Sequence, residues 1–264
     1  MVCAFHGKDE KKGQVGMSLY DAIDARFSCR AYADQPLDQA ALEDFSSYAA
    51  MLGEEGGLRF VVVGPEDGGA QLELSRRMFT GTVSSYVALI GPDDNATRER
   101  FGYYGEKLVL HATELGLGTC WVAGTFNRES VVVPLSEGEV IHDVIPLGHM
   151  PAKQPLAQRT IRAGLRKLDK KPGALYQGPT SLSAAPKWVQ AGIAAVLKGP
   201  SAVNGQPVVF VQEESGLRAT LPHFKCEVEY TDLGIAKLHF QLGAEAAGTA
   251  GTWEWGQEGR FVLS

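Results

Sequence analysis

Apolar residues recur at helical spacing in five segments of the chain, and short runs of β-branched residues lie between them. The first segment, residues 18–27, predicts a short helix whose Ser18 and Asp21 stand in the arrangement of a capping box. The other helical patterns lie at 37–52, 98–116, 186–199 and 231–244. Runs typical of buried strands lie at 58–64, 85–91, 119–124, 140–150, 208–212 and 217–221. Together these elements predict an α+β protein with helices packed on sheets.

The order of these elements is similar in two parts of the chain. In each part a valine-rich strand precedes a long helix with a glycine near its start, Gly105 in one and Gly234 in the other. A Gly-Thr pair and a tryptophan then follow. We therefore predict two similar halves in a pseudo-twofold arrangement, residues 17–150 and residues 181–264. The alternative is that units of this kind are common and unrelated.

Two segments differ from these halves in composition. Residues 1–16 are polar and contain glycine, so we expect a flexible N-terminal extension. Residues 151–180 begin with seven basic side chains against the single acid Asp169, and prolines lie among them, so we predict a connector. A contact of this basic stretch with RNA is less favoured than a solvated linker because the chain as a whole is acidic.

The composition is that of a globular protein, with 44% apolar and 21% charged residues among 264 and a formal net charge of −6. This charge argues against a nucleic-acid partner, and no run of 18 apolar residues predicts a membrane span. The four cysteines form no C-x-x-C pair, so we expect no metal site and no disulfide framework. Reduced thiols and the lack of an apolar signal stretch favour a cytoplasmic location.

The stretch RFSCR places two arginines and a serine at alternate positions, Arg26, Ser28 and Arg30. If the chain is extended beyond Ala25, these three side chains project to one side. Guanidinium groups offer forks of donors that match phosphate oxygens, and the hydroxyl adds another donor. The pattern therefore indicates a phosphate clamp, although a solvated surface is favoured if the spacing is taken alone.

Two further stretches have the composition of ligand-binding loops. In GPSAVNGQP, residues 199–207, a hydroxyl, carboxamides and backbone N–H groups precede a strand and would suit a heterocycle or a ribityl chain. In GLGTCWVAG, residues 116–124, small residues would let the backbone approach a flat ligand. A plain turn and a buried strand are the alternatives. Motifs of serine hydrolases, P-loop proteins and zinc proteases are absent, and no catalytic side chain stands out.

With these three stretches, the chain resembles the nitroreductase-like FMN flavoprotein superfamily. In that superfamily an Arg-x-Ser-x-Arg/Lys element ends the first helix and holds the FMN phosphate. A P-S-[SA]-x-N-x-Q-P turn precedes a strand, and a GLGTCW-[IV]-GG stretch passes the isoalloxazine ring. The resemblance covers about residues 17–264. It implies a nitroreductase-like α+β fold, with a mainly antiparallel sheet flanked by helices in each half.

One departure from the ordinary family pattern changes the expected number of sites. The first half carries the Arg-x-Ser-x-Arg element without the Pro-Ser turn, and the second half carries the turn without the arginines. This is similar to the single-chain tandem branch of the superfamily, in which one polypeptide folds like a whole dimer. It implies one composite FMN site, an empty opposite site, and a monomer that needs no partner chain.

The resemblance also implies which residues bind the cofactor. The phosphate would be held by Arg26, Ser28 and Arg30, with Arg159 or Arg162 beside them. The backbone of Val122, Ala123 and Gly124 would pass the flavin ring. The second half would contribute Pro200, Ser201, Ala202 and Asn204.

The activity implied by the resemblance is a ping-pong transfer of electrons from NAD(P)H, through FMN, to a small acceptor such as a nitroaromatic or a quinone. Two alternatives stay open. The protein could bind FMN as a carrier or sensor without efficient turnover, or it could be a flavin-free structural protein. The sequence chooses neither between NADH and NADPH nor among the acceptors.

Overall fold

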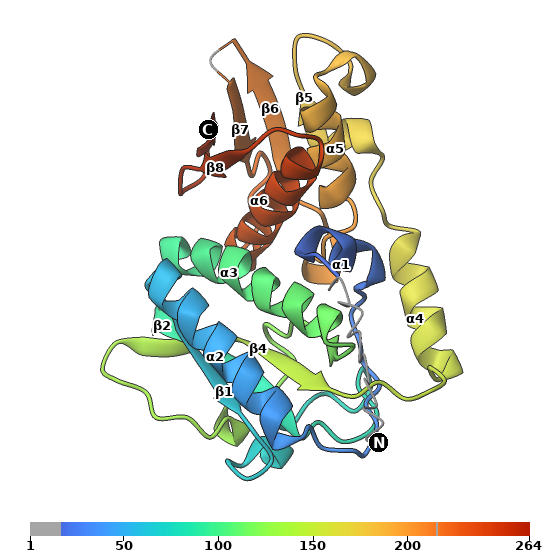
Figure 1. The fold of residues 1–264 in the computed structure, drawn as a ribbon, viewed down its shortest axis with the longest axis vertical. Helices are drawn as coiled ribbons and strands as arrows, with labels where there is room; N and C mark the ends of the chain where they lie inside the picture. Colours follow the sequence, from blue (N-terminus) through green and yellow to red (C-terminus); the bar gives the residue numbers. More distant parts are fainter. Residues whose placement is uncertain (1–16, 215) are drawn as a thin grey trace, which may run out of the picture.

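The computed structural model describes residues 17–214 and 216–264, without the side chains of Arg162 and Arg166. The extension that the sequence predicts at residues 1–16 lies outside the described residues. Two sheets lie at opposite ends of the molecule, the first at the bottom of Figure 1 and the second at the top. Two long helices, α3 (Asn95–Glu114) and α6 (Val228–Ala246), lie between them.

The first sheet has four antiparallel strands in the order β1-β2-β4-β3. Its β2 strand is buried from Ser85 to Gly91 because both faces of the sheet are covered. Val87 and Leu89 belong to the core that the helices form, whereas the alternate residues Tyr86 and Ala88 belong to a second core on the opposite face. The strands are β1 (Arg59–Val63), β2 (Ser85–Pro92), β3 (Gly118–Thr119) and β4 (Glu139–Gly148).

The second sheet has five strands in the order β5-β6-β7-β9-β8. All its neighbouring strands are antiparallel except β5, which pairs with β6 in parallel. The face toward α6 carries stacked and edge-on aromatic rings, with Phe210, Trp253 and Phe261 each within 6 Å of Phe240 or of one another. The strands are β5 (Tyr176–Gln177), β6 (Val209–Glu213), β7 (Gly216–Thr220), β8 (Gly251–Trp253) and β9 (Arg260–Leu263).

The two halves have the same connectivity. In each half a helix precedes two antiparallel strands, a long helix follows, and two further strands complete the sheet in the same spatial order. The first helix of each unit is α2 (Gln39–Gly56) or α5 (Lys187–Val196). The prediction of an α+β fold with two similar, mainly antiparallel halves is therefore confirmed. The residue bounds proposed for the halves stay a prediction.

Helices α3 and α6 cross in close contact because each has a glycine at the crossing. A Cβ atom at Gly102 would overlap the carbonyl group of Thr231, and one at Gly234 would lie 2.6 Å from the backbone nitrogen of Tyr103. Gly102, and not Gly105, is thus the counterpart of Gly234. Gly105 instead makes room for Trp121, whose ring would lie 2.6 Å from a Cβ there.

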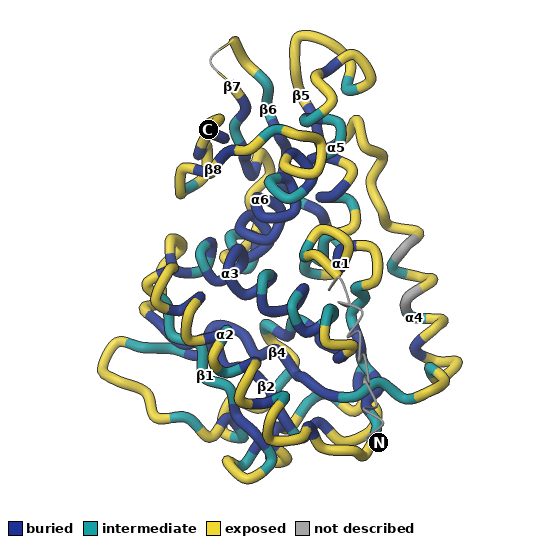
Figure 2. Tube along the Cα trace, viewed as in Figure 1, coloured by how far each residue is buried: buried dark blue, intermediate teal, exposed yellow. Residues whose placement is uncertain are grey.

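The predicted connector contains a helix that the sequence analysis did not predict, α4 (Leu156–Arg166). Pro155 stands at its N-cap, so this proline precedes a helix instead of interrupting one. The helix lies along the side of the molecule and is mostly exposed (Figures 1 and 2). It contacts both halves, because Gln158 donates to the carbonyl of Met78 and the carbonyl of Leu165 accepts from the second half.

Candidate functional site

The first helix ends where the predicted phosphate clamp begins. Helix α1 (Leu19–Ala25) starts at the predicted capping box, in which Ser18 and Asp21 bond each other's backbone N–H groups. It stops at Arg26, whose backbone is extended. The following segment pairs with two neighbours, since Cys29 donates to the carbonyl of Thr119 and Tyr32 to that of Thr80. The chain is therefore extended beyond Ala25, as a clamp of alternate side chains requires.

The three clamp residues surround one buried thiol. Arg26, Ser28 and Arg30 all act on Cys120, which also lies within the GLGTCWVAG stretch. The Nε atoms of both arginines are buried and have no hydrogen-bond partner among the described residues. Burial raises the pKa of Cys120, and it raises that of Cys29 to about 11, so both thiols stay protonated at neutral pH. The cradle is thus cationic, with donor capacity left over.

Arg26 also joins the two halves of the chain. Its Nη2 donates to the carbonyl of Lys198 at 3.0 Å, directly before the GPSAVNGQP loop. Next to this contact, Lys198 forms an ion pair with Asp24 of α1 at 2.5 Å. The structure therefore brings the first-half arginines to the start of the second-half loop. The two predicted half-sites meet at this point.

Next to Arg26 lies a buried polar network around Glu106, which the sequence did not predict. Glu106 is fully buried, accepts from the indole Nε1 of Trp121 at 2.7 Å, and lies 3.7 Å from the Nε of Arg26. Its other contact is the Nε2 of His239 at 2.9 Å, while the Nδ1 of His239 faces the carbonyl of Ala195. Both ring nitrogens of His239 therefore face oxygen atoms, one from each half of the chain.

The GPSAVNGQP loop is held in an uncommon backbone conformation. Val203, Asn204 and Gln206 all have positive φ angles, of 47°, 55° and 43°. For a β-branched residue such as Val203 this conformation is an outlier, and strain of this kind concentrates at functional sites. Inside the loop, the Oγ of Ser201 accepts from the backbone of Gln206 at 2.9 Å. The side chain of Val203 is 84% exposed, so its strain is not compensated by packing.

Hydrogen bonds to three residues outside the loop fix this conformation. The Asn204 carboxamide donates to the carbonyl of Leu165 at 2.8 Å and to Asp169 at 2.7 Å. The backbone of Ala202 donates to the carboxylate of Asp232, at 3.0 Å from Oδ1 and 3.2 Å from Oδ2. The carboxamide N–H groups of Asn204 are therefore engaged by α4 and the residues after it. Only its oxygen is left to meet a ligand.

The remaining predicted residues lie in three separate segments. The N–H of Val122 donates to Val144, so it cannot donate to a ligand, and the stretch beyond it opens toward solvent at Ala123 and Gly124. Arg159 lies on the exposed surface of α4. Arg162 lies on the same helix, but its side chain is outside the described part. Pro200 is half-buried at the start of the strained loop.

The carboxyl group beneath the loop titrates near neutral pH. Burial raises the pKa of Asp232 to about 7. The hydrogen bond from Ala202 lowers this pKa, and the nearby carboxylates of Asp143 and Glu229 raise it. Burial likewise raises the pKa of Asp143 to about 7, although Arg98 and Arg128 lower it. Each folded-state pKa lies above the ordinary value of 3.8, so the folded protein binds these protons more tightly than the unfolded chain does.

This pair predicts a measurable dependence of stability on pH. The stabilisation is complete below pH ~4 and is lost as the pH rises toward 7, with a slope of up to about 1.4 kcal/mol per pH unit for each group. Asp232→Asn keeps an acceptor for Ala202 but removes one titration. In urea unfolding between pH 4.5 and 7.5, this variant should show a shallower fall than the wild type. The control Glu66→Gln, at an exposed carboxyl group, should match the wild type, and an equal slope in all three proteins would contradict the assignment.

Neither a metal cluster nor a membrane helix is found in the part of the chain that the structure describes. No three His, Cys, Asp or Glu side chains gather there in a way that could hold a metal ion. No helix of residues 17–214 and 216–264 is both long enough and apolar enough to cross a bilayer. Among the cysteines of these residues, Cys29, Cys120 and Cys226 are all unbridged.

Comparisons with known proteins place this geometry in a family. Residues 18–244 match the family described as "Putative TM nitroreductase". Among solved structures, the chain is similar to a putative nitroreductase from Thermotoga maritima MSB8, with a TM-score of 0.61 and 17% identity over 98% of each chain. A search of the curated proteins found no match.

Two shorter structural matches cover about half of the chain. One is an FMN-dependent nitroreductase from Clostridium difficile R20291, with a TM-score of 0.39 and 18% identity over 50% of this chain and 88% of that one. The other is a putative NADH dehydrogenase/NAD(P)H nitroreductase from Parabacteroides distasonis ATCC 8503, with a TM-score of 0.40 and 21% identity over 52% and 89%. Since the family match spans most of its length, the chain belongs to the putative TM nitroreductase family.

Proposed function

We propose that this protein is an FMN-dependent oxidoreductase that passes electrons from NAD(P)H to a small acceptor such as a nitroaromatic or a quinone. The observation that carries the proposal is the cationic cradle formed by Arg26, Ser28 and Arg30. Its two guanidinium Nε atoms are buried without a hydrogen-bond partner, which is costly, and only that of Arg26 has a carboxylate nearby, Glu106 at 3.7 Å. Membership of a nitroreductase family supports an oxidoreductase reaction at this cradle.

The residues present fit the phosphate end of FMN. Arg30 would donate to the phosphate with its whole guanidinium, because no carboxylate among the described residues forms an ion pair with it. Arg26 would contribute charge and its Nε, which donates no hydrogen bond in the described part, since its Nη2 is engaged by the Lys198 carbonyl. Ser28 would add a hydroxyl donor. Charge-assisted bonds of this kind are about twice as strong as neutral ones, so the arginines should dominate the affinity.

The residues that would meet the rest of the cofactor come from both halves. When bound, the flavin supplies the chemistry, which is to accept electrons from the nicotinamide and release them to the acceptor. The backbone of Ala123 and Gly124 can lie against a flat ring, since a Cβ at Gly124 would have open space around it. The strained loop at Ser201–Asn204 would cover the other side, held in place by Asp232. In this scheme the side chains bind and orient, and none transfers a proton.

Arg30→Gln should weaken FMN binding by about 10- to 100-fold, because it removes one or two charge-assisted hydrogen bonds worth about 1.5–3 kcal/mol. The measurement is a titration of the purified apoprotein with FMN, followed by quenching of flavin fluorescence. Arg260→Gln is the matched control, since Arg260 is exposed on β9 in the second sheet. It should leave the affinity unchanged. Equal affinities in the wild type and Arg30→Gln would contradict the phosphate clamp.

The amount of flavin and its reduction separate the proposal from its alternatives. About one FMN released per chain is expected from one composite site, and two would contradict the single site but not the family. NADH or NADPH added without air should bleach the flavin absorbance, and an acceptor should restore it. Tight binding without bleaching would favour a carrier or sensor. A protein that binds no FMN at all would leave the flavin-free structural role.

A further inference from the structure

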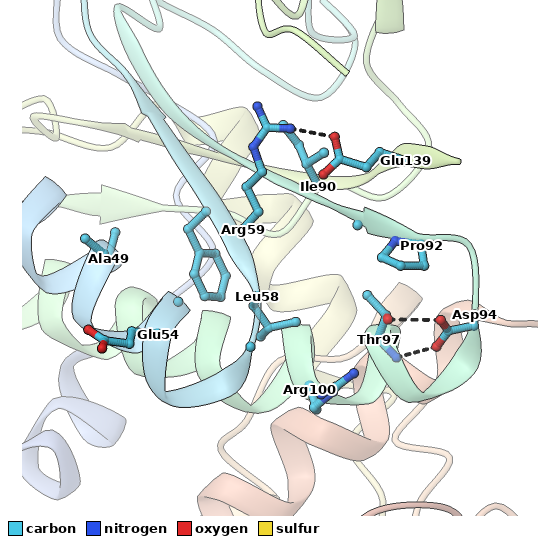
Figure 3. A pocket seen from close by; sticks show the side chains of 15 residues that line it. Ala49, Glu54, Leu58, Arg59, Ile90, Pro92, Asp94, Thr97, Arg100 and Glu139 are labelled. Atoms are coloured by element: carbon cyan, nitrogen blue, oxygen red, sulfur yellow. Dashed lines mark hydrogen bonds and ion pairs between the residues drawn. The ribbon is translucent and has the colours of Figure 1, made fainter. Parts of the chain in front are cut away.

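A pocket lies away from the arginine cradle, at the outer edge of the first sheet. It has a volume of about 510 Å³ and opens between α2, the strands β1 and β2, and the first turns of α3. Figure 3 shows Leu58 in the middle of its lining, with Arg100 at one end. This volume lies within the range of small-molecule sites in proteins, about 300–1,000 Å³.

Arg100 brings a guanidinium group without an ion-pair partner among the described residues to this pocket. No carboxylate among the described residues lies within ion-pair distance of it, and its Nε is buried without a hydrogen-bond partner. The only hydrogen bond that its guanidinium donates in the described part is to the carbonyl of Gly56, at a long 3.5 Å. A guanidinium so placed has donors left for an anion.

The other charged residues of the pocket are engaged or distant. Arg59 is paired with Glu139 at 2.6 Å. Asp94 accepts from the backbone of Thr97 at 2.7 Å and caps α3. Glu54 is exposed and lies at the other end of the pocket from Arg100, beyond Leu58 in Figure 3. Arg100 is thus the cation of this pocket that a ligand can meet.

The balance of charge around the pocket limits the class of ligand. Its lining has two cationic and three anionic side chains, so every negative charge on a ligand meets some repulsion, and a phosphate dianion meets more of it than a monoanion. A single carboxylate on an apolar body fits better. The carboxylate would accept from Arg100 in the planar, two-point geometry that guanidinium groups favour, and the body would lie on the apolar wall of Ala49, Leu58 and Phe60.

We propose that this pocket binds a small aromatic or aliphatic monocarboxylate, with Arg100 as the residue that recognises the carboxylate. The proposal does not depend on the flavin, because the lining residues belong to α2, β1, β2, α3, the start of β4 and the turns between them, and none belongs to the arginine cradle or to the strained loop. It assigns a binding function to the first half that is separate from electron transfer.

The test compares an acid with its neutral amide. Binding of 2-naphthoate and 2-naphthamide to the whole protein is measured by calorimetry, with FMN present in excess to occupy any flavin site. Arg100→Gln should weaken naphthoate binding at least about 10-fold, from the loss of a charge-assisted bond, and should leave naphthamide unchanged. Arg98→Gln on the same helix is the control, since Arg98 pairs with Asp93 and Glu227 outside the pocket.

A second variant tests the location without touching the charge. Ala50 is exposed on the pocket side of α2, so Ala50→Trp should fill the pocket and abolish the binding of both probes while the protein stays folded. Far-ultraviolet circular dichroism and melting curves report folding of each variant. The proposal is overturned if the wild type binds no naphthoate at 5 mM, roughly the weakest useful affinity. It is also overturned if Arg100→Gln or Ala50→Trp binds naphthoate as the wild type does.

Discussion

Gly234→Ala should destabilise the protein by about 3 kcal/mol or more, the upper part of the range for overpacked interiors. The new Cβ would lie 2.6 Å from the backbone nitrogen of Tyr103 and closer still to the carbonyl oxygen of Glu99. Both obstacles are backbone atoms of α3, so no side chain can turn away, and the two helices must separate. This strain outweighs the helix propensity of about 1 kcal/mol that alanine gains over glycine. For a chain of this size the melting temperature should fall by about 6–12 °C.

The matched control is Gly164→Ala in α4. A Cβ at Gly164 would meet nothing within 4 Å, so only the helix propensity and the entropy of the unfolded chain change there. This variant should be more stable than the wild type by about 0.5–1 kcal/mol. Denaturant unfolding of both variants gives the two free energies. If Gly234→Ala were as stable as Gly164→Ala, the close crossing of α3 and α6 would be wrong.

The regular elements could be predicted from the sequence because periodicity reports which face of an element is buried. The pattern at 98–116 gave a helix that the structure has at Asn95–Glu114, and the valine-rich run at 58–64 gave β1. In the connector, this reasoning did not lead to the helix that the structure has there. Its helix α4 has apolar residues at helical spacing, Ala157, Ile161 and Leu165, but the basic residues and prolines around them suggested a break.

The candidate site was predictable in its parts but not in its contacts. Motif and spacing indicated that the arginines at 26 and 30 belong together, and the structure places both beside Cys120. The spacing of the motif does not show that the Nη2 of Arg26 donates to the carbonyl of Lys198, since that hydrogen bond joins residues 172 positions apart. The strained φ angle of Val203 was equally hidden, because valine rarely adopts it.

Buried ionisable groups were missed although a signal for them exists. Helix α6 reads LGIAKLHF in its middle, where Lys237 and His239 stand among apolar residues. A charge within an otherwise apolar helical stretch predicts a buried partner on a neighbouring element. The structure supplies one for each from α3, namely Glu99 for Lys237 and Glu106 for His239. The sequence alone could not pair them, since the crossing at Gly102 and Gly234 sets which positions face each other.

Lys237→Met should cost about 3–5 kcal/mol of unfolding free energy, the usual effect of removing one partner of a buried ion pair. The Lys237 Nζ is fully buried, lies 2.5 Å from Glu99, and donates to the carbonyls of Glu254 and Gly256 at 2.8 and 2.9 Å. Methionine fills nearly the same volume, so the loss is electrostatic. The substitution leaves the buried Glu99 carboxylate with the Gly256 N–H as its remaining donor in the described part. It also leaves the carbonyls of Glu254 and Gly256 without the donor that Lys237 supplied.

The same substitution at Lys107 of α3 removes an equal charge from a more exposed ion pair, so it shows how much of the cost at Lys237 comes from burial. Lys107 pairs with the half-exposed Glu55 at 3.3 Å, so Lys107→Met should cost no more than about 1 kcal/mol. Adding Glu99→Gln to Lys237→Met removes the stranded charge and should restore part of the stability, a coupling of about 0.5–3 kcal/mol in a double-mutant cycle. Equal costs for the two lysine variants, or no coupling with Glu99, would show that this pair does not join the two halves as an ion pair. Its full burial between α3 and the second sheet makes the larger cost the expected one, because water cannot replace the lost partner.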